Sequence, residues 1–134
     1  MATTLETIGT YLDEMGMKYV LKDEDRPRIL TGFKMKSYRD TDGDPSLSIV
    51  IALLENGEYL KIFAPNCYSY KDGPHKRALF EACLAISWRT KLIQFEYDPS
   101  DGEVRCIVEW PLEDAPLTKR QLERSLKGIV NLLD

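Results

Sequence analysis

The Asn56-Gly57 dipeptide lies between two segments in which apolar residues recur at every second position. Asparagine and glycine both tolerate the positive backbone angles that a two-residue hairpin turn requires. The dipeptide therefore predicts that a strand over Ser46–Leu54 turns back into a strand over Glu58–Ala64, with Glu55 opposite Glu58. In that register one face of the hairpin is apolar and belongs to the core. This face consists of Leu47, Ile49, Ile51, Leu53, Leu60, Ile62 and Ala64.

The residues before this hairpin predict one helix and two more strands. Apolar residues at helical spacing indicate a helix over Thr4–Met15, for which Thr3 and Glu6 form a capping-box pattern. Met17–Lys22 and Arg28–Lys36 show the alternation that is typical of half-buried strands.

The residues after the hairpin predict a helix, two strands and a last helix. The middle helix covers Pro74–Arg89, with proline at its first position, where the missing amide donor costs nothing. Apolar residues alternate with polar ones from Ile93 to Tyr97 and again from Val104 to Trp110, which indicates two strands joined by a turn. The last helix follows Thr118 and Gln121, which form a second capping box.

This succession of elements predicts the α+β class. The expected fold is an antiparallel sheet packed with helices, in the order α-β-β-β-β-α-β-β-α. With 134 residues, the chain is long enough to bury a core without disulfides or metals. Residues 1–134 are therefore expected to form a single domain.

The composition excludes several classes of function. A net charge of −4 disfavours nucleic acid as a partner, because sequence-independent binding to phosphates needs a basic surface. No apolar segment is long enough to cross a bilayer, and no leader pattern precedes the first helix. The three cysteines lack C-x-x-C spacing, so we expect reduced thiols and a cytoplasmic protein without a membrane contact.

Two residue sets could support catalysis. Asp40, Asp42 and Asp44 alternate as calcium ligands do, but the glycine and glutamate positions of a calcium loop are absent, and an acidic turn is the simpler interpretation. Cys67 and His75 could form a thiol–imidazole pair, but no third group orients the imidazole. A metal-dependent or thiol enzyme built on one of these sets is the alternative hypothesis. Phosphate-binding loops are absent, so we expect no cofactor and no catalytic residues.

The reverse side of the central hairpin departs from the expected alternation. An antiparallel sheet with one solvated face carries polar residues there, whereas this side carries Val50, Leu54, Tyr59 and Phe63. Either a helix or another part of the chain covers these residues, or they bind a partner protein. We select these four residues as the candidate partner-binding surface.

The middle helix has more apolar residues than one core face needs. Phe80, Leu84 and Trp88 form a second stripe at helical spacing. This stripe either packs on neighbouring elements of the same chain or forms a two-fold dimer contact with Trp88 as its anchor. The second interpretation predicts a homodimer.

The segment between Ala85 and Thr118 resembles the YbjN family of small bacterial proteins, which are described as candidate sensory transduction regulators. The residues that carry the resemblance are Trp88, Arg89, Lys91, Phe95, Asp98, the run Asp101-Gly102-Glu103-Val104, and PLEDAPLT at the end of the segment. The order of the elements extends the resemblance over nearly the whole chain.

The resemblance implies a fold and a class of function. The family is related in fold to type III secretion chaperones, which are α+β homodimers that hold extended segments of client proteins. A non-enzymatic, dimeric, protein-binding module is therefore the expected function, and a purely structural subunit is a weaker alternative. Function does not follow from fold, and the resemblance brings no catalytic residues to this chain.

Overall fold

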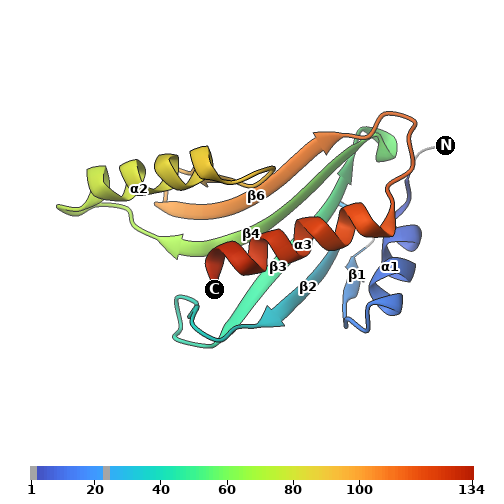
Figure 1. Cartoon of the computed structure of the whole chain (residues 1–134), viewed down its shortest axis with the longest axis horizontal. Helices are drawn as coiled ribbons and strands as arrows, with labels where there is room; N and C mark the ends of the chain where they lie inside the picture. Colours follow the sequence, from blue (N-terminus) through green and yellow to red (C-terminus); the bar gives the residue numbers. More distant parts are fainter. Residues whose placement is uncertain (1–2, 23–24) are drawn as a thin grey trace.

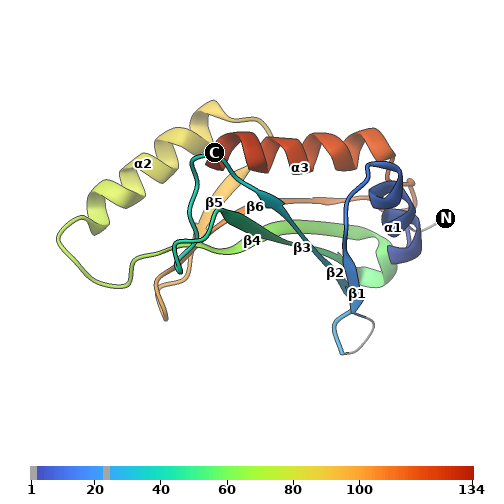
Figure 2. The same cartoon turned by 90° about the horizontal axis from the view of Figure 1, so that it is seen from below.

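The computed structural model describes residues 3–22 and 25–134 and contains one antiparallel sheet of six strands with three helices on one of its faces (Figures 1 and 2). The elements confirm the predicted α+β class and order. They are α1 (Leu5–Glu14), β1 (Val20–Lys22), β2 (Arg28–Lys34), β3 (Ser46–Leu54), β4 (Tyr59–Ser69), α2 (Lys76–Arg89), β5 (Gln94–Tyr97), β6 (Glu103–Pro111) and α3 (Lys119–Leu133).

The strands lie in the order β1-β2-β3-β4-β6-β5, and every neighbouring pair is antiparallel. After β4 the chain passes through α2, forms the edge strand β5 and returns as β6 beside β4. The long strands β3, β4 and β6 therefore form the middle of the sheet, and the short strands β1 and β5 form its edges.

The central hairpin has the register that the Asn-Gly turn predicted. Ile51 pairs with Ile62 and Leu53 pairs with Leu60. The strands close at Leu54 and Tyr59, and the Glu58 amide donates to the Glu55 carbonyl across the turn at 3.1 Å. Asn56 and Gly57 have φ angles of 58° and 88°, the left-handed region that these two residue types tolerate best.

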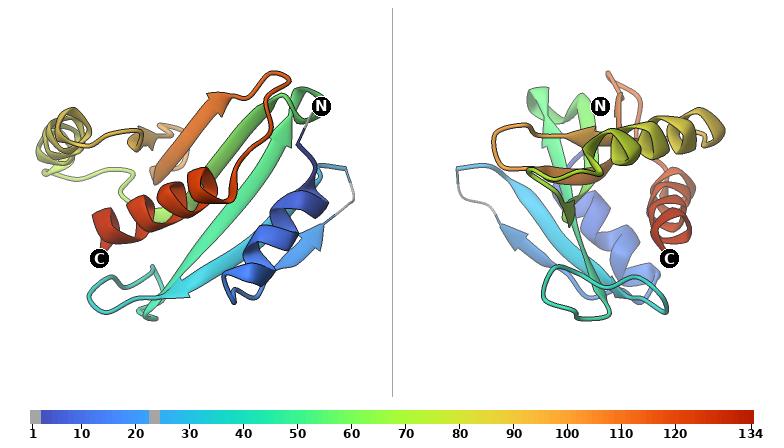
Figure 3. Two further views of the ribbon diagram at one scale, coloured as in Figure 1. Left: turned by 45° about the vertical axis from the view of Figure 1, so that its right-hand side comes forward. Right: turned by 90° about the vertical axis from the view of Figure 1, so that its left-hand side faces the viewer.

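Helices α1 and α3 cover the sheet face on which the apolar hairpin residues lie (Figure 3). α3 buries one stripe at helical spacing, and its predicted capping box is present, since the Thr118 hydroxyl accepts from the Gln121 amide at 3.1 Å. The Tyr11 hydroxyl of α1 donates to the Leu117 carbonyl just before α3 at 2.9 Å. The buried stripe of α3 consists of Leu122, Ser125, Leu126, Ile129 and Leu133.

The first helix is capped one residue later than predicted. Thr4 is the N-cap, and its hydroxyl accepts from the Thr7 amide at 3.2 Å. Thr3 is buried instead, and its hydroxyl accepts from the Leu117 amide at 2.9 Å. Either of the two adjacent threonines could cap the helix. Because the Thr3 hydroxyl is bonded to the Leu117 amide, Thr4 caps the helix instead.

β1 and β2 are shorter than predicted. β1 starts only at Val20, and β2 ends at Lys34. Beyond β2, the Met35 amide donates to the Pro45 carbonyl, and the carboxylate of Asp134 accepts from the amides of residues 36–38. The amides that would continue β2 are therefore already paired. These bonds also lower the pKa of the Asp134 carboxyl group.

β4 continues five residues past the predicted end at Ala64. The pairing with β6 shifts its register between Ala64 and Tyr68, a segment that contains Pro65 and Asn66 with a φ of 49°. A proline cannot donate a ladder hydrogen bond, and a bulge is one of the few places in a sheet where it fits. The strand resumes after this bulge, with Cys67 buried.

Helix α2 begins at Lys76, with His75 as its N-cap, so the prediction of Pro74 as the first helical residue is wrong. The hydroxyl of Tyr70 accepts from the His75 amide at 2.8 Å, which holds the preceding turn outside the helix. The helix projects past the end of the sheet (Figure 1), and none of its residues is buried. Its neighbour in the sheet is the edge strand β5.

Candidate functional site

The sheet has one face that no helix covers in the part of the chain that the structure describes. Figure 2 shows α1, α2 and α3 on the same side of the sheet. We call the opposite side the open face. The alternative in which a helix covers the reverse side of the central hairpin is therefore wrong for the described residues.

An apolar row crosses the open face from strand to strand. Paired residues in neighbouring strands project to the same face, and here the pairs run in sequence through β1, β2, β3, β4 and β6. Val20, at the edge, is 54% exposed, whereas Ile107 near the other edge is buried. The row consists of Val20, Leu30, Val50, Phe63 and Ile107.

The structure brings the four predicted partner-binding residues onto this open face. Val50 and Phe63 are cross-strand partners within the apolar row, and Leu54 and Tyr59 pair at the end of the same hairpin. Val50, Tyr59 and Phe63 are half-buried, and Leu54 is 45% exposed. Desolvation, followed by the nearby Glu109 carboxylate, raises the pKa of Tyr59, so its hydroxyl stays neutral.

Cationic side chains, which the sequence interpretation did not select, surround the apolar residues of the open face. The Lys61 ammonium lies 5.4 Å and the Arg105 guanidinium 4.8 Å from the centre of the Phe63 ring, which is the geometry of a cation–π contact. Arg105 also pairs with Glu96 at 2.8 Å. The sequence contains a signal for Lys61 and Arg105, because every second residue of a strand lies on one face. Lys61 is two residues from Phe63 in β4, and Arg105 is two residues from Ile107 in β6.

A shallow depression lies on the open face next to the start of β2. Its apolar lining comes from β3 and β4 and includes Val50, Ala52 and Phe63. Its polar lining comes from Asp25, Arg26 and Arg28 at the start of β2 and from Lys61 and Arg105 in the sheet. The Arg28 guanidinium donates to the Arg26 carbonyl at 3.0 Å, which holds this segment beside the sheet.

The predicted dimer-contact residues lie on α2 with different exposures. Leu84 is 72% exposed and Trp88 is 89% exposed. Phe80 instead packs edge-to-face on Tyr97 of β5, with ring centres 4.6 Å apart. The chain therefore leaves Phe80 half-buried against β5 and the Leu84 and Trp88 side chains in contact with solvent.

The three aspartates of the acidic turn form hydrogen bonds that a turn requires. One Asp40 carboxylate oxygen accepts from the amides of Asp42 and Asp44, at 2.9 and 2.8 Å. The Gly43 amide donates to the Asp40 carbonyl, which closes the turn. Asp40 thus stabilises the loop between β2 and β3, as the turn composition predicted.

Cys67 and His75 do not form a pair in the structure. The Cys67 thiol is buried and donates to the Val104 carbonyl at 3.1 Å, whereas His75 is exposed at the start of α2. Desolvation raises the pKa of Cys67 to about 12, so the thiol is protonated at neutral pH. Desolvation likewise raises the pKa of Cys106, which is also buried, to about 12.

We expect Cys67 and Cys106 to resist thiol reagents in the folded protein. At about pH 8, native protein in which Cys83 is replaced by serine should not react with Ellman's reagent, whereas the denatured variant should release two equivalents. Because folding raises both pKa values from 9.0, stability is expected to fall as the pH rises from about 9 to about 12. Rapid modification of Cys67 in the native variant would contradict this interpretation.

A second acidic group lies in the turn between β5 and β6. One carboxylate oxygen from each of Asp98, Asp101 and Glu103 lies within 4.8 Å of the others. All three already accept hydrogen bonds: Asp98 and Asp101 within the turn and Glu103 from the Asn66 amide. Two bonds from Ser100 lower the pKa of Asp98. These hydrogen bonds show that the three carboxylates stabilise the turn and its contact with β4.

Comparison with known proteins identifies the fold. A scan against protein-family models gives no match, and a search of curated proteins gives none either. Among solved structures, the crystal structure of YbjN from E. coli superposes with a TM-score of 0.64 over 97% of this chain and 88% of that chain. The chain has the YbjN fold.

The resemblance that the sequence suggested is therefore confirmed at the level of the fold. YbjN is described as a candidate transcription regulator, and its sequence is 15% identical to that of this chain. An identity this low relates the two folds and transfers no activity. No helix in the described residues combines the length and the apolar character that crossing a membrane requires.

Proposed function

We propose that this chain is a non-enzymatic, cytoplasmic protein-binding module of chaperone or regulatory type that acts as a homodimer. Its open sheet face holds a segment of a partner protein. The single observation that supports this proposal most is the absence of any covering helix, within the described residues, over an apolar row that crosses the sheet. An apolar row that stays partly exposed on an uncovered sheet face is typical of interaction sites.

Three further observations support the proposal. YbjN, which has the same fold, is described as a candidate regulator. Leu84 and Trp88 expose most of their side-chain surface on α2, and a large aromatic residue of this kind is typical of the anchor of a protein interface. The three free cysteines are compatible with the reducing cytoplasm.

A pull-down from extract of the native host tests the binding function. Wild-type protein is compared with the double variant Tyr59→Ser and Phe63→Ser, and with Leu92→Ser as the control. Leu92 is 53% exposed and lines a depression together with Ser125 and Gly128 of α3, on the helix-covered side. We expect a partner that wild type and the control capture and that the double variant loses, while circular dichroism shows that all three proteins are folded.

Other outcomes would count against this proposal. If the double variant captures the same proteins as wild type, the open face is not the binding surface. If wild type captures only its own second copy, the protein is a self-contained dimer and the client-binding function is wrong.

A further inference from the structure

A basic row lies beside the apolar row on the open face. The pairing of β1, β2, β3 and β4 places Lys22, Arg28, Ala52 and Lys61 in one line across the strands, two residues along from the apolar row, and Glu109 of β6 follows Lys61 at the end of this line. Rows two residues apart on one face of a sheet are about 7 Å apart. An occupant that lies across the strands can therefore contact both rows at once.

The polar lining of this depression is mostly cationic. Its lining contains Arg26, Arg28, Lys61 and Arg105, and Asp25 is its one carboxylate. Of the four cations, Arg105 forms an ion pair, with Glu96, and the described part of the chain places no carboxylate within ion-pair distance of the other three. Arg28 and Arg105 are held in place by short hydrogen bonds.

This local charge is opposite to the charge of the whole chain, which is −4. Cations that have no carboxylate partner among residues 3–22 and 25–134, beside a largely apolar floor, are complementary to a ligand that carries both carboxylates and apolar side chains. A neutral apolar ligand would leave Arg26, Arg28 and Lys61 partly desolvated and unpaired, which is unfavourable. The charge therefore restricts the chemistry of the occupant.

We propose that the occupant of the open face is an acidic polypeptide segment that also carries apolar side chains. Its carboxylates pair with Arg26, Arg28 and Lys61, while its apolar side chains pack on Val50 and Phe63. This inference rests on the proposed function, because it specifies the partner that the open face binds.

The same surface is less suitable for nucleic acid. Proteins that bind single strands stack successive bases on several aromatic rings, whereas the described lining of this depression contains one aromatic residue, Phe63. A net charge of −4 also repels a polymer that carries one phosphate per nucleotide. A peptide with a few carboxylates avoids most of that repulsion.

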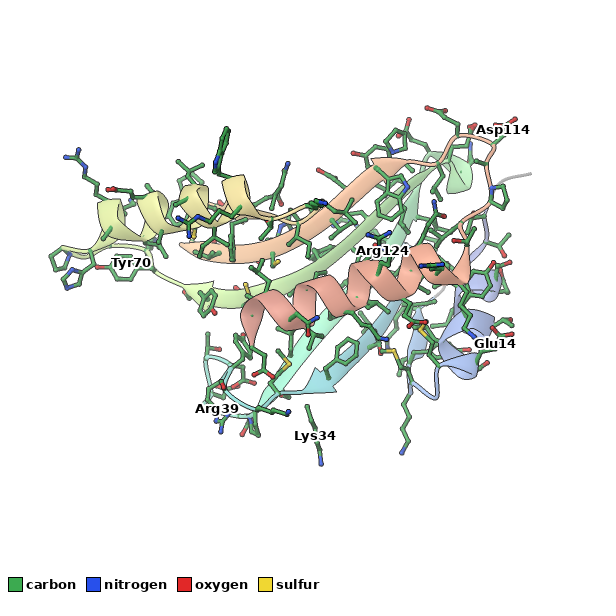
Figure 4. All side chains as sticks on the ribbon, viewed as in Figure 1. Glu14, Lys34, Arg39, Tyr70, Asp114 and Arg124 are labelled. Atoms are coloured by element: carbon green, nitrogen blue, oxygen red, sulfur yellow. The ribbon has the colours of Figure 1, made fainter. Side chains whose placement is uncertain are left out.

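The test is a fluorescence anisotropy titration of the full chain with short labelled peptides. The first peptide alternates glutamate with leucine, and two matched peptides replace every glutamate with glutamine or with lysine. The protein variants are Arg26→Gln/Lys61→Gln and, as the control, Arg120→Gln/Arg124→Gln on the exposed side of α3 (Figure 4). Both double variants change the net charge equally, and glutamine keeps much of the aliphatic stem.

We expect the glutamate peptide to bind wild type and the α3 control equally, and to bind the Arg26/Lys61 variant about tenfold more weakly. Added salt should weaken binding to wild type more than to that variant. Equal binding of the glutamate and glutamine peptides would overturn the charge inference and leave the binding module intact. If no peptide binds, both proposals fail. Competition by a single-stranded oligonucleotide would overturn the choice of a polypeptide.

Discussion

The proposed homodimer predicts that the double variant Leu84→Glu and Trp88→Glu is a monomer at concentrations at which the wild-type protein dimerises. A two-fold interface uses the same patch on both copies, so each substitution removes two contacts and introduces two charges. Trp88 is 89% exposed in the single chain, and a dimer contact would bury its indole ring. Replacing it by glutamate removes this favourable burial. We expect the dimer dissociation constant to rise about a hundredfold or more.

Sedimentation equilibrium measures this change directly. The control is Ala78→Glu and Ala82→Glu, because these two residues are also exposed on α2 and lie on another side of the helix. The control adds the same charge to the same helix and should remain dimeric. A wild-type protein that is monomeric at every concentration tested would contradict the homodimer.

The substitution Gly102→Ala is expected to destabilise the protein by about 3 kcal/mol, which lowers the melting temperature by about 10 °C. Gly102 has a φ of 82° in the turn before β6, where an alanine is strained. A Cβ atom at this position would also lie 2.5 Å from the backbone nitrogen of Lys71. Lys71 cannot move away easily, because the amide of Tyr70 before it donates to the Gly102 carbonyl at 2.8 Å.

Gly43→Ala separates these two causes. Gly43 has a similar φ of 87°, but no atom lies within 4 Å of the Cβ that alanine would add. It should therefore cost only the backbone strain, about 1 kcal/mol. Thermal unfolding of both variants gives the comparison. Equal losses would show that the Lys71 backbone adjusts and that the close approach contributes nothing.

Local signals in the sequence predict most of this fold. The Asn56-Gly57 turn fixes the hairpin register, and the Thr118 capping box places the start of α3, because both depend on residues that are close in the chain. The wrong details have distant causes. Thr3 bonds to Leu117, more than a hundred residues away, and the amides after β2 bond to Asp134. Such pairs leave no local pattern.

The candidate surface was only partly predictable. Failed alternation identifies Val50 and Phe63, because that signal lies within one hairpin. The cations come from three separate parts of the chain, and only the order of the strands brings Arg28, Lys61 and Arg105 to one depression. The exposure of Trp88 depends on which side of α2 faces β5, which periodicity does not indicate.

The position of α3 after all six strands in the chain has a consequence for biosynthesis. Leu122, Leu126 and Ile129 of this helix are at most 1% exposed and cover strands that the ribosome makes earlier. Until α3 emerges from the exit tunnel, the inner face of the finished sheet lacks this cover. The nascent chain therefore exposes apolar surface on both sides of its sheet until α3 has been synthesised and has packed on these strands.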